Sequence, residues 1–521
     1  MHGRPATQPL GTAGASHPRR WRILVVLLLA LLVTSIDHTI INVALPSLAV
    51  DLGASSAGLQ WIVDSYTLVF AGLLLIAGAL GDRFGRRGAL AAGLVAFAVG
   101  SVVAASGSSV ASVIAGRAVM GIGGALIMPA TLSILVNVFG DPRERAKAIG
   151  VWAAVSGAGI AIGPIVGGAL MTRFSWSSVF WINVPLLLAA LALTFHLVPR
   201  SRAGRPSRLD PVGAVLSIAA ITAVTYAVIE APENGWTSAV TGSLLVAGLA
   251  IAVAFVWWEL RRPEPMLDVR LFRLPAFTAA SLSLTLLFFA MAGAMFLQAQ
   301  YLQFVLGFSA LGAGAALVPA ALGMLAGTGL GSHLPAAHGA RLAVAAGTVA
   351  GAFGLALQAV FTDGGSYLPT GIGLFLFGIG AGVAMPAATD SIMGALPAAR
   401  SGVGSAVNDT TRELGGVLGV AVVGSVAATA YSTSMQAATL GGPGLPEAVR
   451  TAVNDSIGAA MAVSADLGAD GAGLARVAVD AFVGGMGGAL WVAAAVALWG
   501  TIVAAVHLPR PQAPAAPTQL A

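Results

Sequence analysis

Two carboxylates stand inside apolar segments that are long enough to cross a bilayer as helices. Asp37 lies within the segment from Arg22 to Pro46, and Asp64 lies near the start of the next apolar segment. About 20 apolar residues span the hydrocarbon core. A carboxylate near its centre costs at least about 2.5 kcal/mol. Each acid therefore needs a partner, a proton or a functional role.

Arg117 is a natural partner for an ionised Asp37. It enters the fourth apolar segment to about the depth at which Asp64 enters the second. Attraction between Arg117 and Asp37 favours the ionised acid, and helix motion that separates them favours proton uptake. Our hypothesis makes Asp37 the leading proton site, with Asp64 sharing the proton or meeting a cationic substrate. The alternatives are a static ion pair and, for Asp64, a position near the outer interface.

A second polar group lies in the thirteenth apolar segment, at Asn408, Asp409, Arg412 and Glu413. Helical spacing puts Asn408 and Arg412 on one face and Asp409 and Glu413 on the next. Arg412 can neutralise Asp409 locally, which gives the group a structural role. The other interpretation is a part in proton coupling or gating.

The ninth apolar segment combines methionines and aromatics with a few amides. Such side chains suit an adaptable apolar pocket. We assign five residues to the wall of a substrate cavity, and the alternative is that they face lipid or the core. The five are Phe296, Gln298, Tyr301, Gln303 and Asn408.

The composition excludes a soluble protein. Of 521 residues, 57% are hydrophobic and only 9% are charged, whereas soluble domains carry about 25% charged residues. The net charge of +5 fits positive residues collected in cytoplasmic loops better than nucleic-acid binding. The absence of cysteine excludes disulfides and cysteine-bound metals. Lys147 is the single lysine and lies outside any GxxxxGK[ST] motif, so an ion gradient or another subunit must drive active transport. No cofactor is expected.

We predict fourteen membrane-spanning helices. Starting with the N-terminus in the cytoplasm puts most arginines on the cytoplasmic side, and both termini then lie there. The long segment 432–481 forms either short amphipathic helices on the outer membrane surface or a partly disordered connector. The predicted spans are 22–46, 58–80, 88–107, 110–137, 145–170, 178–198, 211–230, 240–260, 276–305, 310–333, 341–361, 367–395, 402–431 and 482–507.

A short internal repeat divides the chain into halves. GIGGALIMPA begins at Gly121 and GIGAGVAMPA begins at Gly378. Parallel duplication of a six-helix unit is a known transporter architecture. The expected divisions are a cytoplasmic tail (1–20), a six-helix bundle (21–200), two inserted helices (201–265), a second six-helix bundle with the outer loop (266–508) and a second tail (509–521).

The loop after the second span reads GALGDRFGRR, from Gly78 to Arg87. This signature resembles the one that the major facilitator superfamily carries between its second and third helices. Three further stretches resemble motifs of the fourteen-span drug:proton antiporter branch, which includes multidrug and quaternary-ammonium exporters. They are IDHTIINVALP in the first span, AGRAVMGIGGALIMPA in the fourth and GAGIAIGPIVGG in the fifth.

The resemblance implies an all-α membrane protein with two six-helix bundles, a central cavity and alternating access. It also implies export of lipophilic or cationic compounds in exchange for protons. The loop would control the cytoplasmic gate through Gly78, Asp82, Arg83, Gly85, Arg86 and Arg87.

The fifth span carries glycines at intervals of four residues, which make one smooth face for close helix packing. Pro164 within it can kink the helix. The resemblance adds that this helix hinders proton leak and favours export over uptake. The motif residues are Gly159, Gly163, Pro164, Gly167 and Gly168.

The sequence therefore predicts a monomeric, fourteen-helix, proton-driven efflux pump of the cytoplasmic membrane that exports amphiphilic drugs or natural products. The alternatives are an uptake permease of the same fold and a non-transporting membrane sensor. A membrane-embedded enzyme is disfavoured because the chain has neither an HExxH motif nor a cysteine.

Overall fold

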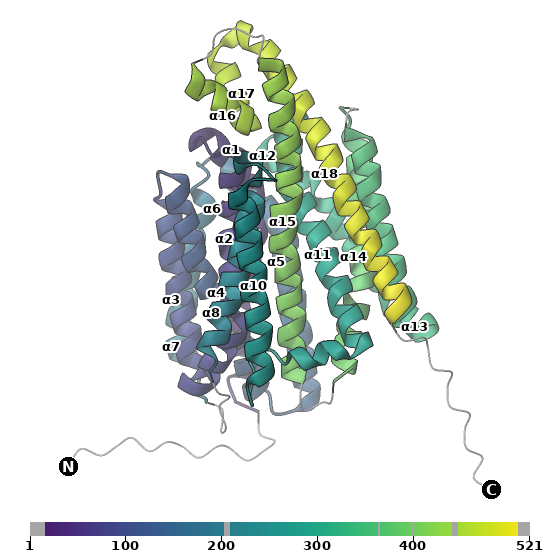
Figure 1. The fold of residues 1–521 in the computed structure, drawn as a ribbon. Coiled ribbons are helices and arrows are strands. Elements are labelled where there is room, and N and C mark those ends of the chain that lie inside the picture. The colour runs from purple at the N-terminus through teal and green to yellow at the C-terminus, as the bar shows by residue number, and fades with distance from the viewer. Residues whose placement is uncertain (1–15, 203–208, 363–364, 397–400, 440–445, 509–521) are drawn as a thin grey trace.

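The computed structural model describes residues 16–202, 209–362, 365–396, 401–439 and 446–508. These ranges are helical and contain no β-strand. Thirteen of their helices are long and apolar enough to cross a membrane, or fourteen when the two bent parts of α5 count as one span. This confirms the predicted all-α membrane fold with fourteen spans (Figure 1).

The first bundle is built from the helices before residue 200. α1 packs against α5 and α7, and α4 packs against α2 and α3. Serine and aspartate side chains cap several helix starts: Ser55 accepts the Gly58 N–H, and Asp141 accepts the N–H groups of Arg143 and Glu144. The helices are α1 (Arg20–Asp51), α2 (Ser56–Phe84), α3 (Arg86–Ala105), α4 (Val110–Val138), α5 (Pro142–Met171), α6 (Ser178–Trp181) and α7 (Asn183–Leu197).

The second bundle is built from the helices after residue 274. α13 carries two of the predicted spans, because Gly339 interrupts it with a φ of 83° that favours glycine. The elements are α11 (Pro275–Gln300), its π-helical continuation η2 (Tyr301–Val305), α12 (Ala310–Ala316), α13 (Val318–Val360), α14 (Tyr367–Gly394), α15 (Ser401–Thr439) and α18 (Ala472–His507).

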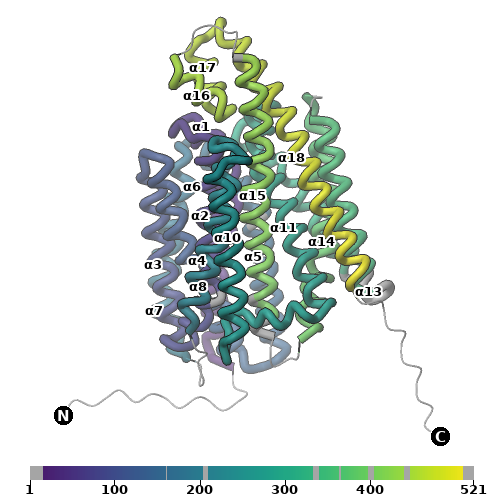
Figure 2. The backbone as a smooth tube through the Cα atoms, viewed as in Figure 1, coloured from purple at the N-terminus to yellow at the C-terminus, as the bar shows by residue number. Residues whose placement is uncertain are grey.

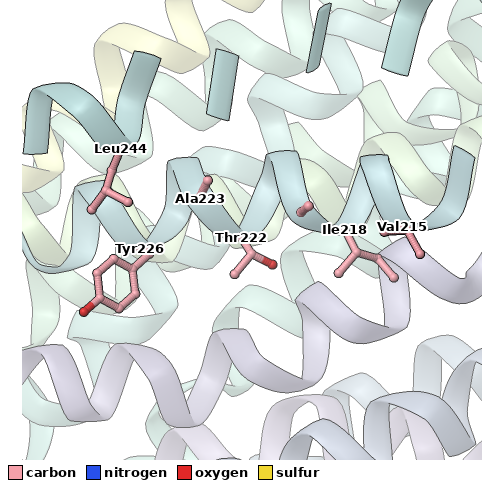
Figure 3. Close-up of a pocket in the computed structure, with 7 residues that line it drawn as sticks. Val215, Ile218, Thr222, Ala223, Tyr226 and Leu244 are labelled. Atoms are coloured by element: carbon pink, nitrogen blue, oxygen red, sulfur yellow. The ribbon is translucent and has the colours of Figure 1, made fainter. Parts of the chain in front are cut away.

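Two inserted helices, α8 (Pro211–Ile229) and α10 (Ala239–Arg261), pack against each other. The short α9 (Ala231–Asn234) lies between them in the chain, and α8 also contacts α2 and α15. An apolar groove of about 510 Å³ runs along their outer surface (Figure 3). Its lining includes Val215, which is 65% exposed, and contains no charged side chain. Such a groove suits lipid chains.

The segment between α15 and α18 contains α16 (Glu447–Asp455), α17 (Ile457–Asp466) and the short η5 (Gly468–Gly471). Of the two interpretations of residues 432–481, the described part therefore fits short helices. They do not stand alone, because the Ser56 hydroxyl of α2 donates to the Asp455 carbonyl at 2.6 Å. We call α16 and α17 together the hairpin. Figure 2 shows the hairpin beyond α1, at the end of the molecule opposite the C-terminus of α18. We call these the hairpin end and the terminal end.

Candidate functional site

Asp37 on α1 is fully buried, and both of its carboxylate oxygens have partners. Arg117 Nη1 of α4 lies 2.6 Å from Asp37 Oδ2. Asn183 Nδ2, at the start of α7, donates to Asp37 Oδ1 at 2.9 Å. The ion pair predicted from the sequence is present, and Asn183 is a partner that sequence reasoning missed.

Arg117 is also fixed by further contacts within the first bundle. Its Nε donates to the Ile62 carbonyl of α2 at 3.1 Å, and its guanidinium carbon lies 4.5 Å from the centre of the Tyr66 ring. A buried ion pair is stable only where further hydrogen bonds satisfy both ions. All these groups belong to the first bundle, so rigid-body rocking of the two bundles leaves the pair intact. The geometry therefore favours the static alternative for Asp37 and Arg117.

Asp64 on α2 is as buried as Asp37, yet neither of its carboxylate oxygens has a hydrogen-bond partner in the described structure. Helical spacing puts it on the same face as Gln60 and Thr67. Gln60 Oε1 accepts a hydrogen bond from Ser425 of α15 at 3.2 Å. A Cβ built on Gly416 of α15 would lie 4.0 Å from Thr67 Cγ2. Asp64 thus faces α15, across the boundary between the two bundles.

The polar group of the thirteenth span lies on α15. Arg412 Nη1 is 3.9 Å from Asp409 Oδ1, and Asn408 Nδ2 donates to the same oxygen at 3.3 Å. The predicted local neutralisation is present, although the ion pair is long. Glu413 is half-buried, and no ion pair to another described residue holds it.

This polar group lies close to both bundles. The guanidinium of Arg412 is 4.7 Å from the centre of the Phe288 ring on α11. Arg412 and Glu413 also lie close enough to interact electrostatically with His38 of α1 and Tyr66 of α2, respectively. The arrangement puts a partly exposed group of charged side chains, which we call the charged patch, close to both bundles.

The loop between α2 and α3 holds the predicted gate residues. Gly85 makes the sharp break between the helices with a φ of 113°, a conformation that side chains rarely adopt. Asp82 accepts a hydrogen bond from Arg86 Nε at 3.0 Å, and Arg86 also donates to the Ser133 carbonyl of α4. Arg87 donates to the Val198 carbonyl.

The other two gate residues fit the same picture. Gly78 faces Pro129 of α4, and the Arg83 guanidinium lies 5.7 Å from the centre of the Phe84 ring. The contacts recorded for the described part of the loop therefore stay within the first bundle and the segment that follows it.

The glycines of the fifth span pack as predicted. Cβ atoms added to Gly159, Gly163 or Gly167 would overlap with Ser35, Thr39 or Ile40 of α1. On another side, Gly168 lies against Ala310 of α12, in the second bundle. α5 bends by 42° between Gly159 and Ala161, one turn before Pro164, where a proline removes a helical hydrogen bond.

Comparison with known proteins decides the family. Residues 27–420 match the Major Facilitator Superfamily. The chain belongs to that superfamily. It is 38% identical to the multidrug efflux pump LfrA of Mycolicibacterium smegmatis, over 90% of each chain. It is 32% identical to the tetracenomycin C resistance and export protein of Streptomyces glaucescens, over 96% of this chain and 94% of the relative.

Solved major facilitator structures share the fold. A bacterial homologue of the human lysosomal transporter Spinster, in an inward-facing and unoccupied conformation, matches with a TM-score of 0.67. That match has 19% identity and covers 96% of this chain and all of the other. As a member of the superfamily, this protein is a transporter and not an enzyme.

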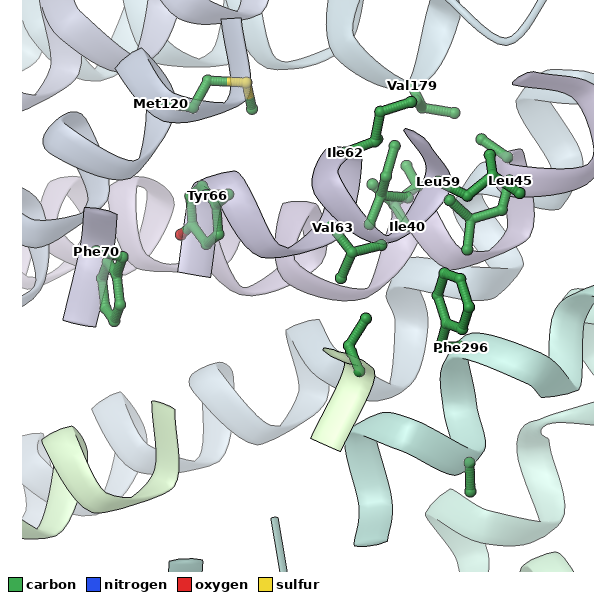
Figure 4. Close-up of a cluster of buried hydrophobic side chains, with 14 of the residues drawn as sticks. Ile40, Leu45, Leu59, Ile62, Val63, Tyr66, Phe70, Met120, Val179 and Phe296 are labelled. Carbon is green, nitrogen blue, oxygen red and sulfur yellow. The ribbon is translucent and has the colours of Figure 1, made fainter. Parts of the chain in front are cut away.

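Three of the five predicted cavity residues make packing or hydrogen-bond contacts in this conformation, and their assignment to a substrate cavity stays a prediction. Phe296 belongs to a buried apolar cluster with Leu45 and points toward it from the second bundle (Figure 4). The Tyr301 hydroxyl donates to the Thr362 carbonyl, and Gln303 Nε2 donates to the Val43 carbonyl of α1. Tyr301 and Gln303 both lie in the π-helical turn η2, which continues α11.

Gln298 and Asn408 behave differently from those three. Gln298 is fully buried, and its amide has no partner in the described ranges. Asn408 Oδ1 accepts a hydrogen bond from Thr389 at 2.9 Å, which fixes it beside Asp409. Gln298 therefore remains a candidate for substrate contact, and Asn408 orients its acidic neighbour.

The two bundles of this major facilitator protein are joined at the hairpin end. Three hydrogen bonds cross between them in the described structure, and each involves the part of α1 or α2 nearest that end: Ser56 to Asp455, Gln303 to Val43, and Ser425 to Gln60. Phe296 of α11 points toward Leu45, which lies in the same part of α1 (Figure 4). The hairpin end is closed in this conformation.

Proposed function

We propose that this protein exports amphiphilic drugs or natural products from the cell in exchange for protons, with Asp64 as the proton carrier. The observation that carries the proposal is the fully buried Asp64 carboxyl, which has no hydrogen-bond partner among the described residues and lies where α2 meets α15. We call this boundary between the bundles the seam. The names of the relatives, which include multidrug efflux and tetracenomycin C export, support the direction and the substrate class.

The distribution of arginine supports the proposed orientation. Arginine-rich loops such as the one around Arg83, Arg86 and Arg87 lie at the terminal end. Positive charge collects on the cytoplasmic side of membrane proteins. We therefore place both termini in the cytoplasm of a cell whose plasma membrane holds the protein as a monomer. The hairpin end then faces outward, and the hydrogen bonds that close it seal the outer side.

Protonation of Asp64 favours closing of the outer seam, which is the contact between α2 and α15 at the hairpin end. An ionised carboxylate buried without a partner costs several kcal/mol, whereas a protonated acid costs much less. When the bundles part at the hairpin end, Asp64 meets outside water and takes up a proton. The neutral acid can then be buried as the seam closes. Departure of the proton toward the charged patch on α15 permits the next opening.

The half-buried Glu413 on α15 is suited to meet a cationic substrate that enters from the cytoplasm. Asp409 is already paired with Arg412, whereas Glu413 has no ion pair to another described residue. Asp37 keeps a different function in this scheme, because its partners Arg117 and Asn183 fix α1 against α4 and α7.

Purified protein in liposomes with an imposed pH gradient tests the proposal. Methyl viologen, which appears in the name of a relative that is 35% identical, serves as the cationic probe, and puromycin serves as a second probe. The wild-type protein is expected to move a probe against its gradient and to dissipate the pH gradient in the same vesicles. Asp64→Asn is expected to lose both while retaining exchange of probe down its own gradient.

Asp480→Asn is the matched control, because it makes the same chemical change on an exposed position of α18. It is expected to transport like the wild type. Full proton-coupled transport by Asp64→Asn would contradict the role of Asp64. Failure of the wild type to move either probe under a pH gradient would contradict drug export itself.

A further inference from the structure

The inserted pair contains two buried carboxylates at the terminal end, far from Asp64. Asp210, which precedes α8, is 2% exposed and caps that helix by accepting the Gly213 N–H at 2.9 Å. The Trp258 indole N–H contacts both of its oxygens, at 3.0 and 3.1 Å. Arg262 Nε lies 3.6 Å from Asp210 Oδ2. These hydrogen-bond donors stabilise Asp210 in its ionised form.

Glu259, in the last turn of α10, is 1% exposed and only half satisfied. Its Oε2 accepts the Leu267 N–H at 3.0 Å. Its Oε1 is buried, with no hydrogen-bond partner in the described part of the chain. That orphan oxygen lies near Asp210, because a Cβ built on Gly213 would lie 2.5 Å from Glu259 Oε1 and 3.0 Å from Asp210 Oδ2. The convergence of the two acids on Gly213 leaves these oxygens at most about 5.5 Å apart.

Among the described residues, Arg262 is the arginine that attracts both acids. Of the nearby described cations, Arg262 is 34% exposed and contacts Asp210. Arg261 stacks on the Trp257 ring, and Arg270 of η1 (Val269–Arg273) donates to the Leu260 carbonyl. Neither is recorded in contact with Glu259. Elsewhere on the elements that pack against α10, the charged residues are Glu233 on α9 and Arg273 on η1, with Asp268 just before η1.

Two carboxylates that share one buried site cannot both stay ionised at low cost, and a proton held between them removes the repulsion. We propose that Asp210 and Glu259 share one proton and form a second proton-binding site, separate from the transport path. The proton on Glu259 Oε1 is directed toward Asp210, which remains the acceptor. The assignment stands on the orphan oxygen and its convergence with Asp210, and it is independent of the proposed export function.

Protonation of this site affects the linker between α10 and α11. Glu259 Oε2 holds the Leu267 N–H, and Leu267 belongs to the linker that leads from α10 to α11, the first helix of the second bundle. Loss of the shared proton creates repulsion between the two acids and drives Glu259 toward water. The Leu267 hydrogen bond is then lost, and the linker loosens. The protonated form is the stabilising one, so the linker is protected at low pH and released as the pH rises.

Hydrogen–deuterium exchange of the linker peptide 262–274 in the purified protein tests this directly. Measured as a protection factor, which removes the intrinsic pH dependence of exchange, the wild-type protection is expected to fall by about tenfold across one titration step. Glu259→Gln keeps the size of the side chain and cannot ionise, so its protection is expected to stay independent of pH. Glu230→Gln, at the hairpin end of the insert and hydrogen bonded to Trp61, is the matched control and is expected to titrate like the wild type.

Infrared difference spectroscopy on the wild type supplies a second readout that needs no variant to fold. One component of the carbonyl absorption of protonated carboxylic acids is expected to disappear over the same pH range as the linker protection. That component is expected to be missing in Glu259→Gln, whereas the absorption of Asp64 persists there. A wild-type linker whose protection factor does not change with pH would overturn the proposal. So would a carbonyl absorption that shows no difference between the wild type and Glu259→Gln over that pH range.

Discussion

Asp37 and Asp64 are equally buried, but their surroundings differ in kind. Asp37 has a guanidinium on one oxygen and an amide on the other. Asp64 has a partner on neither oxygen within the described structure. Burial alone therefore does not distinguish a structural acid from a proton carrier. The partners, and the bundle to which those partners belong, make the distinction.

The difference follows from where each acid faces. The partners of Asp37 lie on α4 and α7, so they move with α1 whenever the first bundle moves as a body. The face of α2 that carries Asp64 meets α15 of the second bundle, through the contact of Gln60 with Ser425. A change in the angle between the bundles alters the surroundings of Asp64 and leaves those of Asp37 unchanged. We therefore prefer Asp64 over Asp37 as the proton site.

The largest expected effect comes from breaking the Asp37 clamp. Asp37→Asn leaves the buried Arg117 guanidinium without a counter-charge, which typically costs 3–5 kcal/mol. We expect a large drop in the thermal unfolding temperature of the purified protein in detergent. Transport assays of this variant would then report on the loss of fold and say little about coupling.

The double variant Asp37→Asn with Arg117→Met separates charge imbalance from loss of shape. Replacing both members of a buried ion pair is often far less damaging than replacing one. The double variant should therefore be more stable than Asp37→Asn. An unfolding temperature of Asp37→Asn equal to that of the wild type would show that the pair contributes nothing, and Asp37 would return as a candidate proton carrier.

A smaller effect is expected from moving α1 without changing any charge. A Cβ at Gly163 would overlap with Thr39 and come within 2.8 Å of the Ile36 carbonyl, on either side of Asp37 in the chain. The backbone cannot yield as a flexible side chain does, so Gly163→Ala must push α5 away from α1. Overpacking of this kind costs about 1–3 kcal/mol, which differential scanning fluorimetry can measure.

Gly157 supplies the control for this change. It lies on the same helix, and an added Cβ there would meet nothing within 4 Å. Gly157→Ala should leave the unfolding temperature unchanged or raise it slightly, because alanine favours the helix. Equal effects of the two substitutions would show that the close contact with α1 is unimportant for stability.

The sequence was sufficient for the fold because lipid requires long apolar helices, and charged loops mark their ends. The spans before residue 432 match the helices to within a few residues, apart from α15, which continues to Thr439. The Asp37–Arg117 pair was also predictable, because two opposite charges at similar depth in apolar helices must find each other.

Other parts of the site were not predictable from the sequence. Asn183 stands at a helix start like many other amides, and nothing local shows that it reaches Asp37. The ninth span is apolar on all sides, so its periodicity cannot say whether Tyr301 and Gln303 face a cavity or a neighbouring helix. Only the tertiary contacts show that both close interfaces at the hairpin end.

The smallest effect on stability is expected from Asp64→Asn, and it is the most direct test of the difference between Asp64 and Asp37. Asp64→Asn makes the same chemical change as Asp37→Asn at the same burial, but it removes no ion pair and no hydrogen bond recorded in the described structure. If Asp64 is protonated in this form, which is closed at the hairpin end, the amide replaces a neutral acid of the same shape. The unfolding free energy should then change by less than about 1 kcal/mol. Parallel unfolding measurements on both variants at neutral pH provide the check. A loss for Asp64→Asn as large as that for Asp37→Asn would mean that Asp64 is ionised and paired in solution, and the outer seam would then close without the proton that we assign to it.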